Sequence, residues 1–181
     1  MRKTVYTNMG STDQMDKLQS FFVDGYVHAT LEEDVDISIF DTMTFVDCTQ
    51  PEELWLDENA KGHLKVLHNY FAEQYISKIF GAFEMKDCAM WSGVDEGSRE
   101  WHNDYEDGDS FNSNILVYLD DNTVDNGNNI QVRDAANHWT LYPKRRDFVW
   151  LNQKKCFQHR AQHKSGVRRV LSFEYLIPAL F

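Results

Sequence analysis

The part of the chain after residue 87 constrains the fold most, because it consists of short runs in which apolar and polar residues alternate. Alternation with a period of two is typical of β-strands that bury one face. Clusters of Gly, Asn and Asp separate the runs, as in DDNTVDNGNN at 120–129, and these residue types favour turns. About eight short strands joined in this way predict a sandwich or a closed barrel.

The expected strands differ in strength, and RRVLSFEYLI at 168–177 gives the clearest pattern. They cover Cys88–Val94, Glu100–Asp104, Ser113–Leu119, Asn129–Arg133, Trp139–Tyr142, Asp147–Leu151, Gln158–Ala161 and Arg168–Ile177.

The first 87 residues carry a stronger helical pattern. Apolar residues recur every three or four positions over 60–80 and Gly81 follows them, which predicts an amphipathic helix that ends at the glycine. Partial alternation over 33–47 predicts one or two strands.

An earlier helix is expected near the N-terminus. Ser11 begins a capping-box pattern, and Gly25 is a stop signal. The apolar stripe between them is formed by Met15, Leu18 and Phe22.

Composition indicates a globular chain with a packed core. It has 181 residues, of which 42 % are hydrophobic and 14 % aromatic. We expect one domain over 1–181, mainly β with helices, in which 1–87 form an N-terminal support and 88–181 form the core. Three distant cysteines, a start without a signal-peptide pattern and no bilayer-length apolar run predict a cytoplasmic protein without membrane contact.

The charge distribution disfavours a nucleic-acid partner. The formal net charge is −11, whereas nucleic-acid binders usually present a basic surface. Residues 140–170 nevertheless contain nine Lys or Arg and one Asp, a net of +8. These cations are either solvated surface groups or a means of attracting an anionic small molecule.

The segment Trp101-His102-Asn103-Asp104 carries the first chemical signal. In a strand, side chains at i and i+2 point to the same face, so His102 and Asp104 can approach one metal ion together. Two histidines and one carboxylate on one face of an octahedron are characteristic of non-haem Fe(II) oxygenases.

A third ligand is expected on a later strand, and His159 fits that position. His163 is the alternative, but the KSG that follows it favours a loop there. Arg168, nine residues after His159, is placed to pair with a carboxylate through its planar fork. Its alternative is Arg169, which alternation places on the opposite face.

The order of these elements over 88–177 resembles the Fe(II)- and 2-oxoglutarate-dependent dioxygenases, particularly the prolyl 4-hydroxylase-like branch. The matching stretches are WHND at 101–104, ILVYLDD at 115–121, DNGNN at 125–129, LYPKRRDFVWLN at 141–152 and HRAQHKSGVRRVLSFEY at 159–175.

The resemblance implies a double-stranded β-helix, or jelly-roll, core with N-terminal helices packed on one side. It implies that His102, Asp104 and His159 ligate Fe(II) and that Arg168 holds the distal carboxylate of 2-oxoglutarate. Tyr118 occupies the place where related hydroxylases offer a hydroxyl to that carboxylate, if the strand register turns it inward. Ascorbate is a possible reductant.

Two departures from the family pattern leave the branch open. The usual Gly-Gly-Glu turn is represented by NGNN, and Arg146 replaces the Gly before the late strand.

The resemblance implies hydroxylation of a protein or peptide residue, with proline as the candidate residue, and release of succinate and carbon dioxide. Oxidation of a free amino acid or other small metabolite is an alternative, as is a non-catalytic cupin-like metal-binding module. Repair of alkylated nucleic acid, as in the AlkB-type branch, is disfavoured by the acidic charge.

Overall fold

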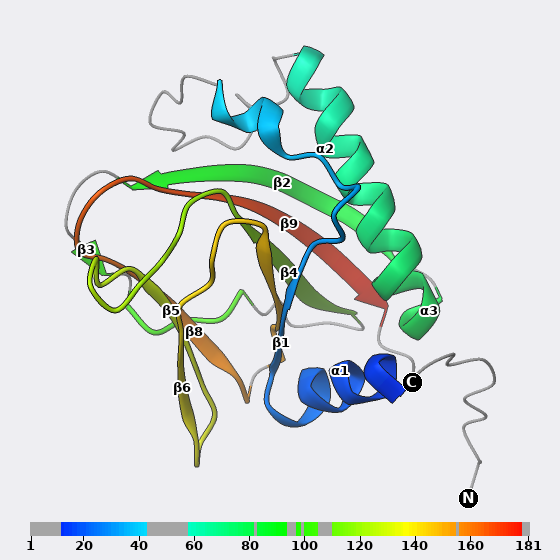
Figure 1. Ribbon diagram of the computed structural model, residues 1–181. Coiled ribbons are helices and arrows are strands. Elements are labelled where there is room, and N and C mark those ends of the chain that lie inside the picture. The colour runs from blue at the N-terminus through cyan, green and yellow to red at the C-terminus, as the bar shows by residue number, and fades with distance from the viewer. Residues whose placement is uncertain are drawn as a thin grey trace, which may run out of the picture.

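The computed structural model describes residues 12–42, 58–81, 83–93, 97–98, 100–104, 110–154 and 156–178 (Figure 1). The first part of the chain is mainly helical and comprises α1 (Thr12–Val23), β1 (Tyr26–Thr30), the 3₁₀ turn η1 (Ser38–Asp41), α2 (Glu58–Phe71), the π-helical turn η3 (Ala72–Ile76) and α3 (Ser77–Phe80). Strands follow, namely β2 (Glu84–Gly93), β3 (Gly97–Ser98), β4 (Ser110–Tyr118), β5 (Asn129–Arg133), β6 (His138–Leu141), β7 (Asp147–Asn152), β8 (Gln158–His163) and β9 (Arg168–Pro178).

The strands form two antiparallel sheets, ordered β1-β7-β4-β9-β2 and β3-β8-β5-β6. Strands β7, β8 and β9 alternate between the sheets along the chain. Buried side chains of both sheets, such as Val149 and Val170 from one and Ile130 and Val132 from the other, pack in a common cluster. These features confirm the predicted jelly-roll core.

Side-chain alternation gives the larger sheet two different faces. In β4, Ile115 and Val117 belong to the hydrophobic cluster that includes the helices, whereas Tyr118 belongs to the cluster between the sheets. In β9, Phe173 and Val170 are divided in the same way. Even-numbered positions of β4 and β9 therefore face the interior between the sheets.

The helices cover the outer face of the larger sheet, where α2 lies over one end of β2 and β9 (Figure 1). Leu64, Leu67 and Phe71 of α2 are buried against this face. The expected helix over 60–80 is confirmed, with an earlier start and a π-helical turn before α3. Gly81, at φ +71°, ends it as predicted.

Two expectations for the N-terminal part were wrong. In α1, Phe21 is fully buried and Phe22 is 44 % exposed, because the helix turns the neighbour of the expected stripe residue toward Trp150. Residues 33–41 form turns and η1 instead of a strand, and Phe40 anchors them in the core. The rest of 33–47, beyond residue 42, lies outside the described residues, as do Ser11 and the side chains of Met15 and Leu18.

Strand β1 was not expected, since its five residues show no clear alternation. It completes the larger sheet by pairing with β7, a strand more than a hundred residues away. Of the other expected strands, Asn129–Arg133 is confirmed with its predicted ends, and all the rest except 100–104 are confirmed with shifted ends. That segment forms no strand among the described residues and pairs with β8 through an isolated bridge between His102 and His159.

Arg146 adopts the left-handed backbone conformation that its glycine counterpart would adopt without strain, with φ +74°. Its Nη1 donates a hydrogen bond to the Val35 carbonyl (3.0 Å), and its Nη2 donates one to the Glu32 carbonyl (2.6 Å). These bonds tie the 32–35 turn to the start of β7 and offset the strain.

No described helix is long and apolar enough to cross a membrane.

A half-buried histidine on α2 makes the stability dependent on pH. The His68 ring stacks on Tyr175, with centroids 5.8 Å apart, and burial lowers the pKa of the imidazole. Because the unfolded chain then takes up the proton more readily, the free energy of unfolding should fall as the pH drops below about 6.5, the ordinary histidine pKa. Urea unfolding at several pH values measures this dependence, and His68→Gln should weaken it. An identical pH dependence in both proteins would contradict the assignment.

Candidate active site

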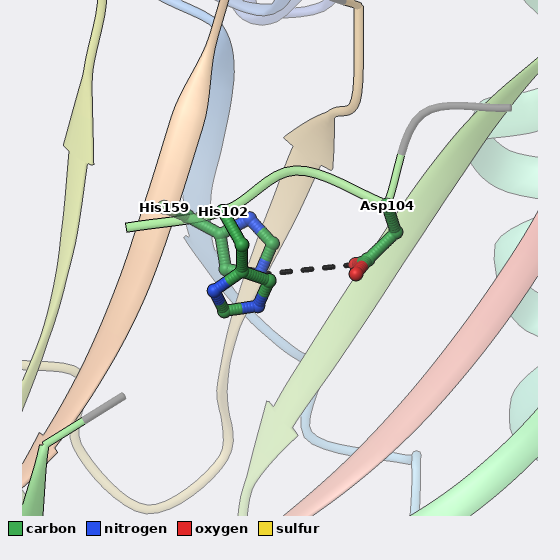
Figure 2. Close-up of side chains that lie close together, drawn as sticks. All are labelled: His102, Asp104 and His159. Carbon is green, nitrogen blue, oxygen red and sulfur yellow. Dashed lines mark ion pairs between the residues drawn. The ribbon is translucent and has the colours of Figure 1, made fainter. Parts of the chain in front are cut away.

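Three side chains with metal-binding atoms meet at one end of the interior between the sheets. His102 and Asp104 come from residues 100–104, which we call the ligand arm, and His159 comes from β8. Their ligand atoms all lie within 4.8 Å of one another. Figure 2 shows the three groups turned toward each other, with Nε2 of His159 3.9 Å from Oδ2 of Asp104. Ligands that share one ion at about 2.0–2.2 Å lie about 3–4 Å apart, so a small contraction would fit a metal.

The bridge between the ligand arm and β8 brings the two imidazoles together. His102 N donates to the His159 carbonyl at 3.1 Å, and His159 N donates to the His102 carbonyl at 2.8 Å. The ring centroids are consequently 4.3 Å apart. Nδ1 of His102 is 2.7 Å from the Glu100 carbonyl, and the tautomer that donates this bond leaves Nε2 as the free ligand atom.

Asp104 is oriented by two amide side chains that sequence reasoning missed. Its Oδ2 accepts hydrogen bonds from Asn114 Nδ2 at 2.8 Å and from Gln153 Nε2 at 3.1 Å. Asn114 projects from β4 into the interior, and Gln153 follows β7 directly. Side-chain alternation along β4 could have predicted that Asn114 points into the interior. The position of Gln153 could not be predicted in this way, because it depends on how the end of β7 packs against the ligand arm. Both bonds hold the carboxylate aimed at the histidines.

The alternative histidine does not join this group. His163 is buried at the end of β8, not in a loop as expected, and its Nε2 is 2.7 Å from the Gly166 carbonyl. The Trp101 ring, next to His102, contacts Arg133 and Arg160 on the outer face of the smaller sheet.

Arg168 and Tyr118 face each other deeper between the sheets. Arg168 is only 8 % exposed, and its guanidinium carbon lies 5.6 Å from the Tyr118 ring centre. Neither the Arg168 Nε nor the Tyr118 hydroxyl has a hydrogen-bond partner within the described parts of the chain. Burial raises the pKa of Tyr118 to about 12, although the nearby guanidinium opposes the rise. Arg169 points the other way, where its Nη2 pairs with Asp120 Oδ1 at 2.6 Å.

The site offers two complementary sets of groups. The ligand group of His102, Asp104 and His159 supplies the nitrogen and oxygen donors that suit Fe(II). A buried guanidinium Nε and a buried hydroxyl that lack hydrogen-bond partners among the described residues are costly unless an anion occupies the space beside them. The donor set therefore fits a metal, and the Arg168–Tyr118 pair fits the far carboxylate of a dicarboxylic acid.

The fold of this chain is similar to that of several solved protein structures. No established family profile and no curated protein matches the sequence. A 2OG-Fe(II) oxygenase family oxidoreductase from Burkholderia pseudomallei is similar, with a TM-score of 0.67, 12 % identity, and coverage of 93 % of this chain and 91 % of that one.

Two further structures extend the similarity. HygX from Streptomyces hygroscopicus, solved with nickel and 2-oxoglutarate bound, has a TM-score of 0.66 and 14 % identity over 92 % of this chain and 87 % of its own. A Trichoplax adhaerens prolyl hydroxylase in complex with a peptide fragment of hypoxia inducible factor has a TM-score of 0.63 and 11 % identity over 94 % of both chains. The chain therefore has the fold of the 2-oxoglutarate- and Fe(II)-dependent oxygenases.

Proposed function

We propose that the protein is an Fe(II)- and 2-oxoglutarate-dependent dioxygenase. The observation that carries the proposal is the convergence of His102, Asp104 and His159, which are up to 57 positions apart in sequence, within 4.8 Å of one another. The similarity in fold to oxygenases, among them one solved with 2-oxoglutarate bound, supports the same conclusion.

Each residue has a defined role in this proposal. His102, Asp104 and His159 hold Fe(II), and the amides of Asn114 and Gln153 keep the carboxylate directed at it. Arg168 and Tyr118 bind the distal carboxylate of 2-oxoglutarate, which fixes the orientation of its keto-acid end. When bound, iron and 2-oxoglutarate supply an oxidation in which dioxygen and the keto acid give succinate and carbon dioxide and the substrate gains a hydroxyl group. Ascorbate is the proposed reductant for iron that becomes oxidised.

We propose a protein or peptide residue, with proline as the first candidate, as the substrate. The fold similarity to a prolyl hydroxylase in complex with a peptide supports this choice. Asn112, Asn114 and Glu174 also support a substrate with hydrogen-bond donors, because they share the interior face beside Asp104. The Oδ1 atoms of both asparagines are buried and have no partner within the described residues. Peptide N–H groups would satisfy such acceptors.

A free amino acid or other polar metabolite is the second candidate. The same three side chains would accept hydrogen bonds from ammonium or hydroxyl groups of a small molecule. A non-catalytic cupin-like module is less consistent with the site, because the site keeps the full set of two histidines, one aspartate and a buried arginine.

The ligand assignment predicts loss of turnover on truncation. His102→Ala and Asp104→Ala should each abolish Fe(II)-dependent conversion of 2-oxoglutarate to succinate, because two ligands do not hold the metal in place. His163→Gln is the matched control, since it changes a histidine on the same face of β8 that lies outside the ligand group. Succinate is measured in anaerobically loaded protein after oxygen is admitted. Turnover that survives in the two alanine variants would exclude the assignment.

The co-substrate assignment predicts a selective loss of affinity. Arg168→Ala should raise the 2-oxoglutarate concentration needed for half-maximal turnover at least about tenfold, because the distal carboxylate loses its paired cation. Ni²⁺ binding should not change. Arg169→Ala serves as the control, since its side chain faces Asp120 on the other side of β9. If Arg168→Ala weakens Ni²⁺ binding to the same extent, Arg168 is a structural residue.

The substrate assignment predicts a preference for peptides. Proline-containing peptides should stimulate succinate formation above the background without substrate, and free proline should have a smaller effect. A mass increase of one oxygen atom in the peptide identifies hydroxylation. Stimulation by free amino acids alone would favour the second candidate.

A further inference from the structure

The ligand arm carries two of the three candidate ligands but has few backbone contacts of its own. Within the described residues, its backbone pairs with β8 through the single bridge between His102 and His159. The Asn103 side chain adds a hydrogen bond from its Nδ2 to the Phe157 carbonyl at 3.4 Å. Asp104 is held separately by the amides of Asn114 and Gln153. The direction of the His102 imidazole therefore depends on what prevents the arm from rotating about its own axis.

Trp101 contacts three strands on the side of the arm opposite to His102. Adjacent side chains of an extended segment point to opposite faces, so Trp101 lies over the outer face of the smaller sheet. Its ring centre is 4.6 Å from the guanidinium carbon of Arg160 in β8 and 4.2 Å from that of Arg133 in β5. The ring also makes an edge contact with His138 in β6, with centroids 5.3 Å apart.

The two guanidinium groups are themselves fixed by cross-strand hydrogen bonds. Arg133 donates from Nε and Nη2 to Gln158 Oε1, at 2.9 and 2.5 Å. Arg160 donates from Nε to Gln131 Oε1 at 2.7 Å, and Gln131 is in turn bonded to Gln162 at 3.1 Å. A ring held against two cations fixed in this way has little freedom to turn.

We infer that Trp101 is a positioning residue that fixes His102 for metal binding by clamping the ligand arm to the outer face of the smaller sheet. The inference rests on the proposed metal site. Because Trp101 and His102 are adjacent and face opposite ways, holding the indole on one side holds the imidazole on the other. The guanidinium groups of Arg133 and Arg160 on the outer face and the proposed metal ion on the inner face would therefore hold the same short segment from both sides.

The test measures Ni²⁺ affinity directly, without turnover. Trp101→Ala should bind Ni²⁺ about 10–100-fold more weakly than the unmodified protein, as expected when a group that orients a ligand is lost. Trp101→Phe keeps a flat ring over the guanidinium groups and should recover most of the affinity. Phe22→Ala removes another partly exposed aromatic ring, on α1, and should leave Ni²⁺ binding unchanged. The affinity for 2-oxoglutarate at saturating Ni²⁺ should stay the same in all variants.

A second variant tests the clamp even if Trp101→Ala fails to fold. The double variant Arg133→Met and Arg160→Met keeps the indole but removes both cations. Like Trp101→Ala, it should weaken Ni²⁺ binding. If the unmodified protein binds Ni²⁺ and the variants at 101, 133 and 160 bind it equally well, the clamp is excluded while the proposed function stands. If the unmodified protein binds no Ni²⁺, the metal site itself is excluded.

Discussion

The candidate site depends on one pair of backbone hydrogen bonds, those between His102 and His159. They join a short arm that forms no regular strand to a strand more than fifty positions later, and they place two imidazoles with centroids 4.3 Å apart. The side chain of Asp104 then completes the group because two amides from β4 and the end of β7 direct it. Without the bridge, the two histidines would belong to separate parts of the surface.

The jelly-roll fold gives the larger sheet, near this bridge, two faces with different environments. Alternation along β4 and β9 sends one set of residues to the helices and the other to the space between the sheets. Within that space, amides and a carboxylate surround Asp104, whereas Arg168 and Tyr118 face each other among apolar residues. Within the described residues, the Arg168 Nε and the Tyr118 hydroxyl have no hydrogen-bond partner. The buried cation is costly unless an anion joins it, and this cost is a physical reason to expect a carboxylate there.

Much of this arrangement could be predicted from the sequence, because the relevant patterns are local. A period of two locates most strands, and it also places Arg168 and Arg169 on opposite faces, as the structure has them. The same parity turns Tyr118 inward. Spacing within the ligand arm identified His102 and Asp104 as a pair, although the arm is not a strand.

The features that were not predicted depend on contacts between distant segments. Strand β1 exists because β7 offers it an edge, and Phe21 replaces Phe22 in the core because Trp150 lies on that side. The orienting role of Gln153 and the contact of Trp101 with Arg133 likewise arise from the relative placement of elements. No local pattern carries that information, since each contact depends on pairing and register across the sheets.

The most direct test of the account is a crystal structure of the protein soaked anaerobically with Mn²⁺ and 2-oxoglutarate, with the ion located by its anomalous scattering. The account predicts a single ion bonded to His102, Asp104 and His159, with the distal carboxylate of 2-oxoglutarate between Arg168 and Tyr118. An ion bound elsewhere, or a co-substrate that does not touch Arg168, would contradict it.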